Sequence, residues 1–360
     1  MQIHKDYNLI ELNTLRVSVR AKFFVEITNE VDLKELFFLP EFKNNQKFFL
    51  GGGSNVLFTK DFDGMVVKIS LLGRKIVKED DKTVLLEAMA GENWHDLVTY
   101  AVDNNLGGIE NLALIPGTVG AAPVQNIAAY GENFSEVFES LDAFNVENGQ
   151  VKSFDKAMCK FGYRESVFKK ELRGKYIILA VRIRLSKDPQ IETSYYQIGI
   201  VRDSIKEELQ KIATPPYVIK NVYQAVVNIR TRKLPDPNKI PNVGSFFLNS
   251  IVSKEKYEEL KKQISELQCY PTDQLQYKNL NDSTLQNGGF VKIATGRLLQ
   301  ELGWLGKWVG NVGIHDKHSL ILVTNGQASG EEVVNFAELV KKSYFERYGI
   351  ELETEVNLIQ

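Results

Sequence analysis

The sequence predicts an α+β fold, in which strands and helices occupy separate stretches of the chain. Short runs of apolar and β-branched residues dominate the first third of the 360 residues. Two amphipathic helical patterns follow each other directly between 198 and 229. A long helical pattern near the C-terminus is followed by an alternating run at 350–359. Together these three observations favour the α+β class.

The first third is expected to consist of strands joined by tight loops, followed by one helix. Strand patterns rich in apolar or β-branched residues lie at 48–50, 56–58, 66–69 and 83–86. Trp94, Leu97, Val98 and Ala101 recur at helical spacing, with a Gly-Gly pair soon after. This spacing predicts a helix over 94–104.

The remaining elements follow from apolar periodicity and from residues that start or stop helices. We expect strands at 176–185, 244–249 and 350–359, and helices at 198–212, 218–229, 257–267 and 329–348. Ser329 and Glu332 form the capping-box pattern of the last helix, and Gly349 marks its end. The proline-rich segment 233–237 is the clearest linker signal in the chain.

The composition excludes several classes of protein. The 44 Lys and Arg nearly balance the 46 Asp and Glu, which argues against a nucleic-acid-binding protein that depends on a basic surface. No apolar run approaches the roughly 18–20 residues that span a bilayer, and Asp6 and Glu11 interrupt the start where a signal peptide would be apolar. Cys159 and Cys269 are far apart and, with four His, show no metal-ligand spacing. We therefore expect a cytoplasmic, globular protein of two or three domains without a bound metal.

Two uncharged, glycine-containing loops can expose several backbone N–H groups. The first, 51–55, is Gly-Gly-Gly-Ser-Asn, and it has neither the Lys of a Walker loop nor the glycine spacing of a Rossmann fingerprint. The second spans 116–123. Two such loops would suit a dinucleotide whose diphosphate is held by main-chain donors. A plain hairpin turn at 51–55, or a tightly packed domain crossing at either loop, would also explain the glycines.

Several segments resemble the UDP-N-acetylenolpyruvoylglucosamine reductase family over nearly the whole chain and in the family's order. They are the stretches at 51–55, 90–95, 110–131, 163–166, 244–247 and 353–356. The resemblance implies a two-part FAD-binding fold of the vanillyl-alcohol-oxidase type, followed by a C-terminal α+β substrate domain. It assigns 1–72 and the returning strand 350–360 to the first FAD-binding subdomain, 73–232 to the second, and 233–349 to the substrate domain.

The resemblance also implies FAD as a non-covalent cofactor and NADPH as co-substrate. His4 and His95 raise the question of a covalent flavin link, but neither lies in a glycine-rich loop. The implied cofactor-binding residues come from the two loops and the turn that follows. They are Gly51, Gly52, Gly53, Ser54, Asn55, Pro116, Gly117, Thr118, Gly120, Ala121, Gln125 and Asn126.

Three residues carry the chemistry that the resemblance implies. Ser245 is the expected proton donor to the substrate carbon next to the one that receives hydride. Arg164 is expected to bind the substrate carboxylate, and Glu355 to pair with Arg164 across the site. Each has a simpler alternative: a surface serine, an ion pair between Arg164 and Glu165, and a solvated acidic strand edge that includes Glu353.

The implied substrate-binding residues are Tyr195, Lys233, Asn249, Tyr270 and His318. Ser245 and Asn249 would point to the same face of an extended strand, roughly 13 Å apart. Tyr196 is an alternative to Tyr195 at that position. Tyr270 could instead pack at a helix end, and His318 could instead be a partly buried structural histidine. The family often has Arg where this chain has Asn357.

The expected function is NADPH-dependent reduction of UDP-N-acetylglucosamine enolpyruvate to UDP-N-acetylmuramate through bound FAD, in peptidoglycan precursor synthesis. The partners are then the UDP-sugar and NADPH, without nucleic acid or membrane, and the protein is expected to be a monomer. An FAD-dependent oxidase of a sugar or lactone on the same fold is the alternative. A catalytically inactive nucleotide-binding module is a further one, which the joint presence of Arg164, Ser245 and Glu355 disfavours.

Overall fold

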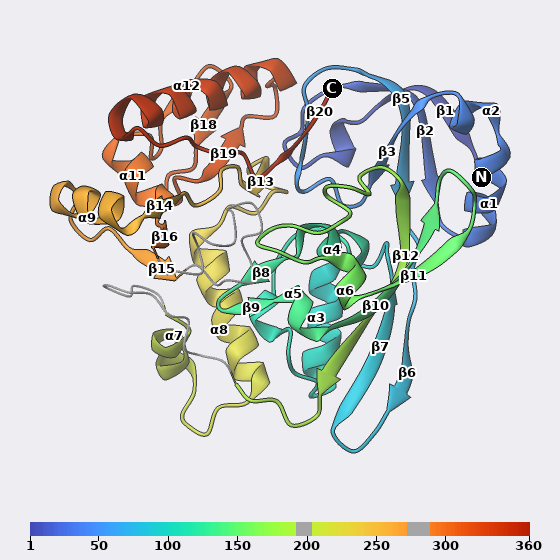
Figure 1. The fold of residues 1–360 in the computed structure, drawn as a ribbon, viewed down its shortest axis with the longest axis horizontal. Coiled ribbons are helices and arrows are strands. Elements are labelled where there is room, and N and C mark those ends of the chain that lie inside the picture. Colours follow the sequence, from blue (N-terminus) through green and yellow to red (C-terminus); the bar gives the residue numbers. More distant parts are fainter. Residues whose placement is uncertain (192–203, 272–288) are drawn as a thin grey trace.

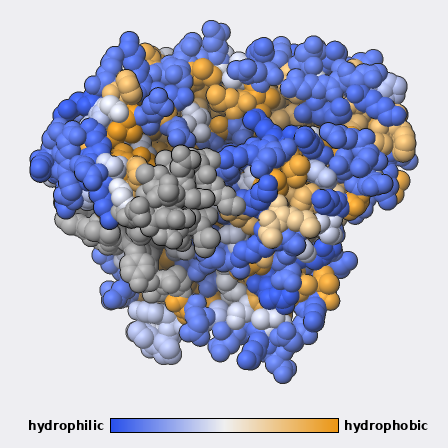
Figure 2. Space-filling model, viewed as in Figure 1, coloured by the Kyte–Doolittle hydropathy of each residue, from blue (hydrophilic) through white to orange (hydrophobic). Residues whose placement is uncertain are grey.

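The computed structural model describes residues 1–191, 204–271 and 289–360. Within these ranges the chain forms three successive regions, each built around its own sheet (Figure 1). No helix in the described ranges is long and apolar enough to cross a membrane. Hydrophilic residues cover most of the face in Figure 2, and its hydrophobic residues form separate groups, as is usual for a globular surface.

The first region is a four-stranded sheet flanked by two short helices. Its strands, in sheet order, are β1 (Ile3–Asn8), β2 (Arg20–Ile27), β5 (Phe62–Ile69) and β3 (Gln46–Leu50). The helices are α1 (Glu30–Phe38) and α2 (Pro40–Lys43). Strand β5 pairs in parallel with both β2 and β3. Its position between two strands makes β5 the buried centre of this sheet.

Strand β5 has a separate hydrophobic core on each face. Met65 and Val67 belong to the core shared with the second region, whereas Phe62 and Val66 belong to the core shared with the third region. This division follows from the alternation of side chains along a strand. The first sheet therefore joins the other two regions.

The second region is an antiparallel five-stranded sheet covered by helices. Its strands, in sheet order, are β11 (Val151–Asp155), β10 (Phe138–Asn145), β12 (Tyr176–Ser186), β7 (Thr83–Met89) and β6 (Arg74–Glu79). The longer helices are α3 (Trp94–Asp103), α7 (Ile205–Ile212) and α8 (Ile219–Lys233). Short elements complete it: α4 (Ala122–Gln125), β8 (Ala128–Ala129), β9 (Glu132–Asn133), α5 (Phe134–Val137) and α6 (Lys156–Cys159).

The third region contains two small antiparallel sheets and the longest helix. One sheet has the order β13 (Asn242–Ser245), β19 (Ile321–Thr324), β18 (Val312–Ile314) and β17 (Trp308–Val309). The other has β14 (Ile251–Ser253), β16 (Phe290–Ile293) and β15 (Cys269–Pro271). The helices are α9 (Lys254–Gln263), α11 (Thr295–Glu301) and α12 (Gly330–Tyr348).

The C-terminal strand returns to the first region. Strand β20 (Asn357–Ile359) pairs in parallel with β4 (Val56–Phe58), the short strand that follows the first glycine loop. Figure 1 shows this strand leaving the third region and ending beside the first. The segment just before β20 is thereby carried past the glycine loop.

Most of the expected elements are confirmed: the strands expected at 48–50, 56–58, 66–69 and 83–86 lie in β3, β4, β5 and β7, and β12, α3 and α8 are present. Strands β1 and β2 were not predicted. The last helix has the expected cap, because the Ser329 and Glu332 side chains bond reciprocally to backbone N–H groups. Gly349 ends that helix in the left-handed conformation, with φ +65°. Of the predicted helix 198–212, the described part is α7, which begins after Ser204.

Three predicted boundaries are wrong. The strand expected at 244–249 begins at Asn242 and ends at Ser245, and Gly244 within it has φ +70°, at an irregularity in the pairing with β19. The helix expected at 257–267 begins earlier and ends at Gln263. The tail forms a strand only at its last residues, and its alternation breaks because Leu358 is exposed while Ile359 is buried.

Candidate active site

The two glycine-containing loops pack directly against each other. The Ser54 hydroxyl donates a hydrogen bond of 3.1 Å to the carbonyl of Pro116. A Cβ on Gly52 would lie 3.1 Å from the Cα of Gly117, and one on Gly51 would lie 2.6 Å from Thr118 Oγ1. Only residues without a side chain allow this approach. The glycines are therefore required by contact between the first and second regions.

The hairpin interpretation of 51–55 is wrong. The loop joins β3 to β4, and these strands do not pair with each other, since β3 pairs with β5 and β4 with β20. The alternative of a packed crossing between regions is present in the structure. It does not compete with ligand binding, because the same loops line two adjoining cavities.

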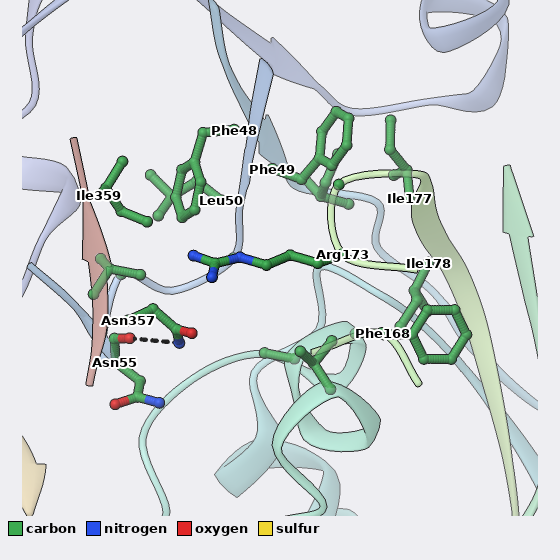
Figure 3. A pocket seen from close by; sticks show the side chains of 18 of the residues that line it. Phe48, Phe49, Leu50, Asn55, Phe168, Arg173, Ile177, Ile178, Asn357 and Ile359 are labelled. Carbon is green, nitrogen blue, oxygen red and sulfur yellow. Dashed lines mark hydrogen bonds between the residues drawn. The ribbon is translucent and has the colours of Figure 1, made fainter. Parts of the chain in front are cut away.

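The first cavity has a volume of about 580 Å³. Its walls are mainly apolar side chains from the first sheet, β12, β20 and the segment before β12. Figure 3 labels Phe48, Phe49, Phe168, Ile178 and Ile359 among them. The first glycine loop closes one end. Such a space suits a flat, apolar ring system with a polar group at the loop.

The second cavity, of about 410 Å³, lies on the other side of the loops. It shares with the first cavity the residues Ser54, Asn55, Thr118, Ala121 and Gln125. An elongated ligand could therefore extend from one cavity into the other past the glycine loops.

Arg164, Ser245 and Glu355 all line the second cavity, although they lie far apart in the sequence. Arg164 Nε is 3.4 Å from Glu355 Oε1, and both side chains are about four-fifths buried, with exposed fractions of 23% and 20%. The backbone N–H of Glu355 donates 2.9 Å to the carbonyl of Phe246, the residue after Ser245. The structure thus brings the three predicted side chains to one place.

A tight turn fixes the position of Arg164. Gly162 and Glu165 exchange backbone hydrogen bonds of 2.9 and 3.3 Å around it. Arg164 itself has φ +52°, which is uncommon for a residue with a side chain and often marks functional positions. One of its terminal nitrogens donates 2.7 Å to the carbonyl of Ala128. The turn therefore holds the guanidinium against the cavity wall.

The simpler alternatives for these residues do not describe the structure. Glu165 forms an ion pair with Lys170, whereas Arg164 pairs with Glu355. Glu353 is exposed, as a solvated edge would require, but Glu355 turns toward the cavity.

Four buried nitrogen atoms around the second cavity make no hydrogen bond with the described part of the chain. They are Gln125 Nε2, Arg164 Nε, Arg230 Nε and His318 Nδ1. Buried polar atoms without partners are rare, and each costs about 1–3 kcal/mol. All four belong to residues that line this cavity, and a polar ligand there would satisfy them.

The second cavity is electropositive. Arg164, Arg230 and Lys233 line it, and Glu355 is the one acidic side chain among the lining residues that the structure describes. Burial lowers the pKa of the Arg230 guanidinium, an effect that the hydrogen bond with Tyr130 opposes. This balance of charge favours an anionic ligand.

His318 is neutral in this setting. Burial, and then the nearby positive charge of Lys233, lower the pKa of its imidazole to about 4. A neutral imidazole can donate from one nitrogen and accept at the other. It therefore adds polarity to the cavity without adding to its charge.

The other predicted substrate residues are less concentrated. Lys233, the last residue of α8, lines the second cavity. Asn249 does not line it, because the predicted strand ends before it, and its side-chain oxygen accepts 3.2 Å from the backbone N–H of Thr295. Tyr195 and Tyr196 lie outside the described residues.

Tyr270 lines neither cavity. It lies beside a lysine that the sequence analysis missed. Lys292 Nζ is 5.4 Å from the Tyr270 ring centre and 4.8 Å from that of Tyr163. Burial and the charge of Arg164 lower the pKa of Lys292 to about 8. Arg230 was also missed, although its position one helical turn before Lys233 could have indicated a shared helix face.

Asn357, found where Arg is common in the family, has a structural contact. Its side-chain amide donates 3.0 Å to the carbonyl of Asn55 and lines the first cavity (Figure 3). His95 accepts a hydrogen bond from the Leu114 backbone and stacks on Tyr223. Neither His95 nor His4 lines either cavity. In the described ranges no group of three or more His, Cys, Asp or Glu side chains could hold a metal ion.

Comparison with known families agrees with this arrangement. An FAD binding domain matches residues 21–155, which include the first glycine loop, the second loop and β10. The C-terminal domain of UDP-N-acetylenolpyruvoylglucosamine reductase matches residues 236–359, which include Ser245 and Glu355. Both cavities adjoin the glycine loops, which lie within the matched FAD binding domain.

Relatives match over the full length of the chain. UDP-N-acetylenolpyruvoylglucosamine reductase of Flavobacterium johnsoniae is 41% identical over 360 residues, and that of Amoebophilus asiaticus is 39% identical, each covering all of both chains. The crystal structure of the enzyme from Thermus caldophilus, MurB, has a TM-score of 0.64 at 21% identity and covers all of this chain and 98% of its own. The expected α+β architecture, an FAD-binding fold followed by a substrate domain, is confirmed. This chain belongs to the UDP-N-acetylenolpyruvoylglucosamine reductase family.

Proposed function

We propose that this chain reduces the enolpyruvyl ether of UDP-N-acetylglucosamine to UDP-N-acetylmuramate, with electrons that NADPH supplies through FAD. The observation that carries the proposal is the convergence of Arg164, Ser245 and Glu355 on the cavity that adjoins the glycine loops. Bound FAD supplies the hydride transfer in this chemistry. The chain's own side chains bind the substrate, orient it and deliver the proton.

Ser245 is the proton donor in this proposal. Addition of hydride at C3 of the enolpyruvyl group leaves carbanion character at C2, next to the carboxylate. A carbanion is basic enough to take a proton from a positioned hydroxyl. The O–H bond of Ser245 breaks, a C–H bond forms at C2, and water returns a proton to the serine oxygen. Strand β13 fixes Ser245 through its pairing with Ile321 of β19.

Arg164 and Glu355 act on the substrate carboxylate. Arg164 lines the second cavity, and its Nε–H makes no hydrogen bond with the described chain, although Glu355 Oε1 lies 3.4 Å away. A carboxylate bound in the cavity would be a further acceptor for the guanidinium. As C2 gains electrons, charge spreads onto the carboxylate oxygens, and a fixed guanidinium stabilises that charge. Glu355, 3.4 Å from Arg164, holds the guanidinium in orientation.

The remaining substrate contacts follow from charge. Lys233 and Arg230 line the second cavity and suit the diphosphate of the UDP-sugar, and His318 offers a neutral polar contact. Tyr195 and Tyr270 keep their proposed roles as further substrate contacts. Asn249 could contact the substrate only if its side-chain oxygen gave up the hydrogen bond that it accepts from the backbone N–H of Thr295.

The chain is further proposed to be a cytoplasmic monomer. The proposal of a monomer is supported by Arg164, Ser245 and Glu355, which already meet at one cavity within a single chain. Both cysteines are buried and free, as is usual in a reducing compartment. The proposed units are 1–72 with 350–360, 73–232 and 233–349. Sedimentation of the holoenzyme checks the monomer.

The test is a comparison of the two half-reactions in Ser245→Ala. Under anaerobic conditions, NADPH should bleach the flavin of the variant at the wild-type rate. UDP-N-acetylglucosamine enolpyruvate should then restore the flavin absorbance about 10²- to 10⁴-fold more slowly, because the general acid is missing. Ser265→Ala, the same change at an exposed position, should leave both steps unchanged.

Equal loss in both half-reactions would contradict the role of Ser245. Fast reoxidation of the reduced wild-type flavin by oxygen, with none by the enolpyruvyl substrate, would instead favour the sugar or lactone oxidase.

A further inference from the structure

An arginine that none of the roles above uses reaches into the first cavity. Arg173 belongs to the segment between α6 and β12 and lines this cavity. Figure 3 shows its side chain running from the side of Ile178 toward the hydrogen-bonded pair Asn55 and Asn357. Its guanidinium therefore points toward the end of the cavity that the glycine loop closes.

The backbone around Arg173 is well anchored. Val167 and Phe168, earlier in the same segment, are buried, and the Phe168 ring contacts that of Phe154 edge-on at 5.0 Å. The backbone N–H of Arg173 donates 3.0 Å to the carbonyl of Lys170. The guanidinium thus extends from a fixed backbone position.

The first cavity is lined by cations without acidic side chains. Lys47, Lys169 and Arg173 line it, and its described lining residues include no Asp or Glu. Lys47 Nζ donates to the carbonyl of Asn45, and Lys169 Nζ donates 2.8 Å to Gln125 Oε1. For the Arg173 guanidinium the described part of the chain provides no side-chain hydrogen bond or ion pair. Its five N–H groups can therefore donate hydrogen bonds to a ligand.

The cations of this cavity repel one another. The pKa of Lys169 is lowered chiefly by burial; the charges of Glu355 and Glu165 oppose this effect, and the positive charges of Arg164 and Arg173 add to it. Bringing an anion into the cavity would relieve this repulsion. An apolar cavity with such a charge suits a ligand that combines a ring system with phosphate groups.

We propose that Arg173 binds the diphosphate of FAD, opposite the N–H groups of the first glycine loop. The proposal rests on FAD as the cofactor. A guanidinium matches phosphate oxygens with two parallel hydrogen bonds, which an ammonium cannot do. The UDP-sugar and NADPH also carry a diphosphate, but the reacting carbon of the UDP-sugar must reach Ser245 in the second cavity, and NADPH must reach the same flavin ring that the substrate meets there. The first cavity, behind the glycine loops, is left to the resident cofactor.

The experiment measures FAD retention by the holoenzyme. Wild type, Arg173→Gln, Arg173→Lys and the control Lys175→Gln are diluted in series, and released FAD is followed by its fluorescence. Lys175, like Arg173, is exposed, but it does not line the cavity. Lys175→Gln therefore removes one positive charge from the same segment without changing the cavity wall. Arg173→Gln should raise the Kd for FAD about 10- to 100-fold, as loss of a charge-assisted pair predicts. Arg173→Lys should fall in between, and the control should match wild type.

The salt dependence of FAD release distinguishes an ionic contact of Arg173 from a contribution of its shape alone. Added salt should speed FAD release from wild type more than from Arg173→Gln, because the variant lacks the ionic contact. An unchanged Kd for FAD in Arg173→Gln would overturn the proposal. So would an unchanged Kd with a raised KM for NADPH, since Arg173 would then bind the co-substrate. If wild type itself retained no FAD, the proposed function would fail, which is a different outcome from a failure confined to Arg173.

Discussion

Among single residues, His318 connects burial with pH most directly. Its side chain lines the second cavity and Nδ1 has no hydrogen bond in the described chain. Because burial holds its folded-state pKa near 4, below the ordinary 6.5, the unfolded chain takes up a proton first as the pH falls. The stability linked to His318 is therefore fully present above about pH 6.5 and is lost as the pH falls toward 4.

His318→Gln should remove this part of the pH dependence. The wild type should lose up to about 3 kcal/mol of unfolding free energy through His318 between pH 6.5 and 4, on top of other groups. The variant has no titrating side chain at this position. Its unfolding free energy should therefore fall by up to about 3 kcal/mol less than that of the wild type over the same pH range. Denaturant unfolding at pH 7, 5.5 and 4.5 measures the difference. Parallel curves for the two proteins would show that His318 is not buried as a neutral group.

At the level of elements, the glycine loops show how contact between regions sets the sequence. Gly52 faces the backbone of Gly117, and a Cβ there would lie 3.1 Å from its Cα. The neighbour is main chain, so it cannot rotate away as a flexible side chain could. Both loops must move apart if a side chain is added.

Gly52→Ala should therefore weaken both stability and FAD binding. We expect a loss of about 1–3 kcal/mol from overpacking, with a raised Kd for FAD because both cavities use these loops. Gly303→Ala is a useful comparison, since Gly303 lines neither cavity and a Cβ there would meet nothing within 4 Å, although φ is +75°. If Gly52→Ala bound FAD like wild type, the loop contact would not be part of the cofactor site.

The same elements show what the sequence could and could not predict. The capped helix α12 was predictable because its start and stop signals are local. The strand at 244–249 was not, because Phe246 and Phe247 are both buried although neighbours on a strand face opposite sides. An apolar run cannot distinguish a buried loop from a buried strand. The tail was misjudged for a similar reason, since the contacts that bury Val356 and Ile359 come from distant parts of the chain.

The site was predictable only in part. Arg164, Ser245 and Glu355 were identified by resemblance, and their convergence depends on the return of β20 to β4, which no local pattern reveals. Arg230 and Lys292 were missed because an arginine or lysine in a sequence reads as a surface residue until its burial is known. Asn249 was expected near the substrate because the strand was drawn too long.

Across the whole molecule, the two cavities lie where separate regions meet. The first and second regions share one hydrophobic core, and the first and third share the other. The glycine loops belong to the first two regions, whereas Ser245 belongs to the third. Ligands in the two cavities thus contact all three regions.

Removal of FAD should lower the melting temperature by a few degrees. A ligand at 100 times its Kd stabilises the folded state by about 2.7 kcal/mol, and the effect grows with concentration. Added FAD should restore the wild-type melting temperature, and riboflavin, which lacks the diphosphate, should restore less. A melting temperature that does not depend on FAD would place the cofactor away from the contact between regions.

The account depends on Arg164, Ser245 and Glu355 acting together on the substrate half of the reaction. The most direct measurement is the rate at which the enolpyruvyl substrate reoxidises the reduced flavin in Ser245→Ala, Glu355→Gln and the double variant. When residues act as a unit, the effects of substituting them do not add. The double variant should therefore be reoxidised little more slowly than the slower single variant, and reduction by NADPH should be preserved in all three. Losses that multiply in the double variant, or that fall equally on the NADPH step, would contradict the account.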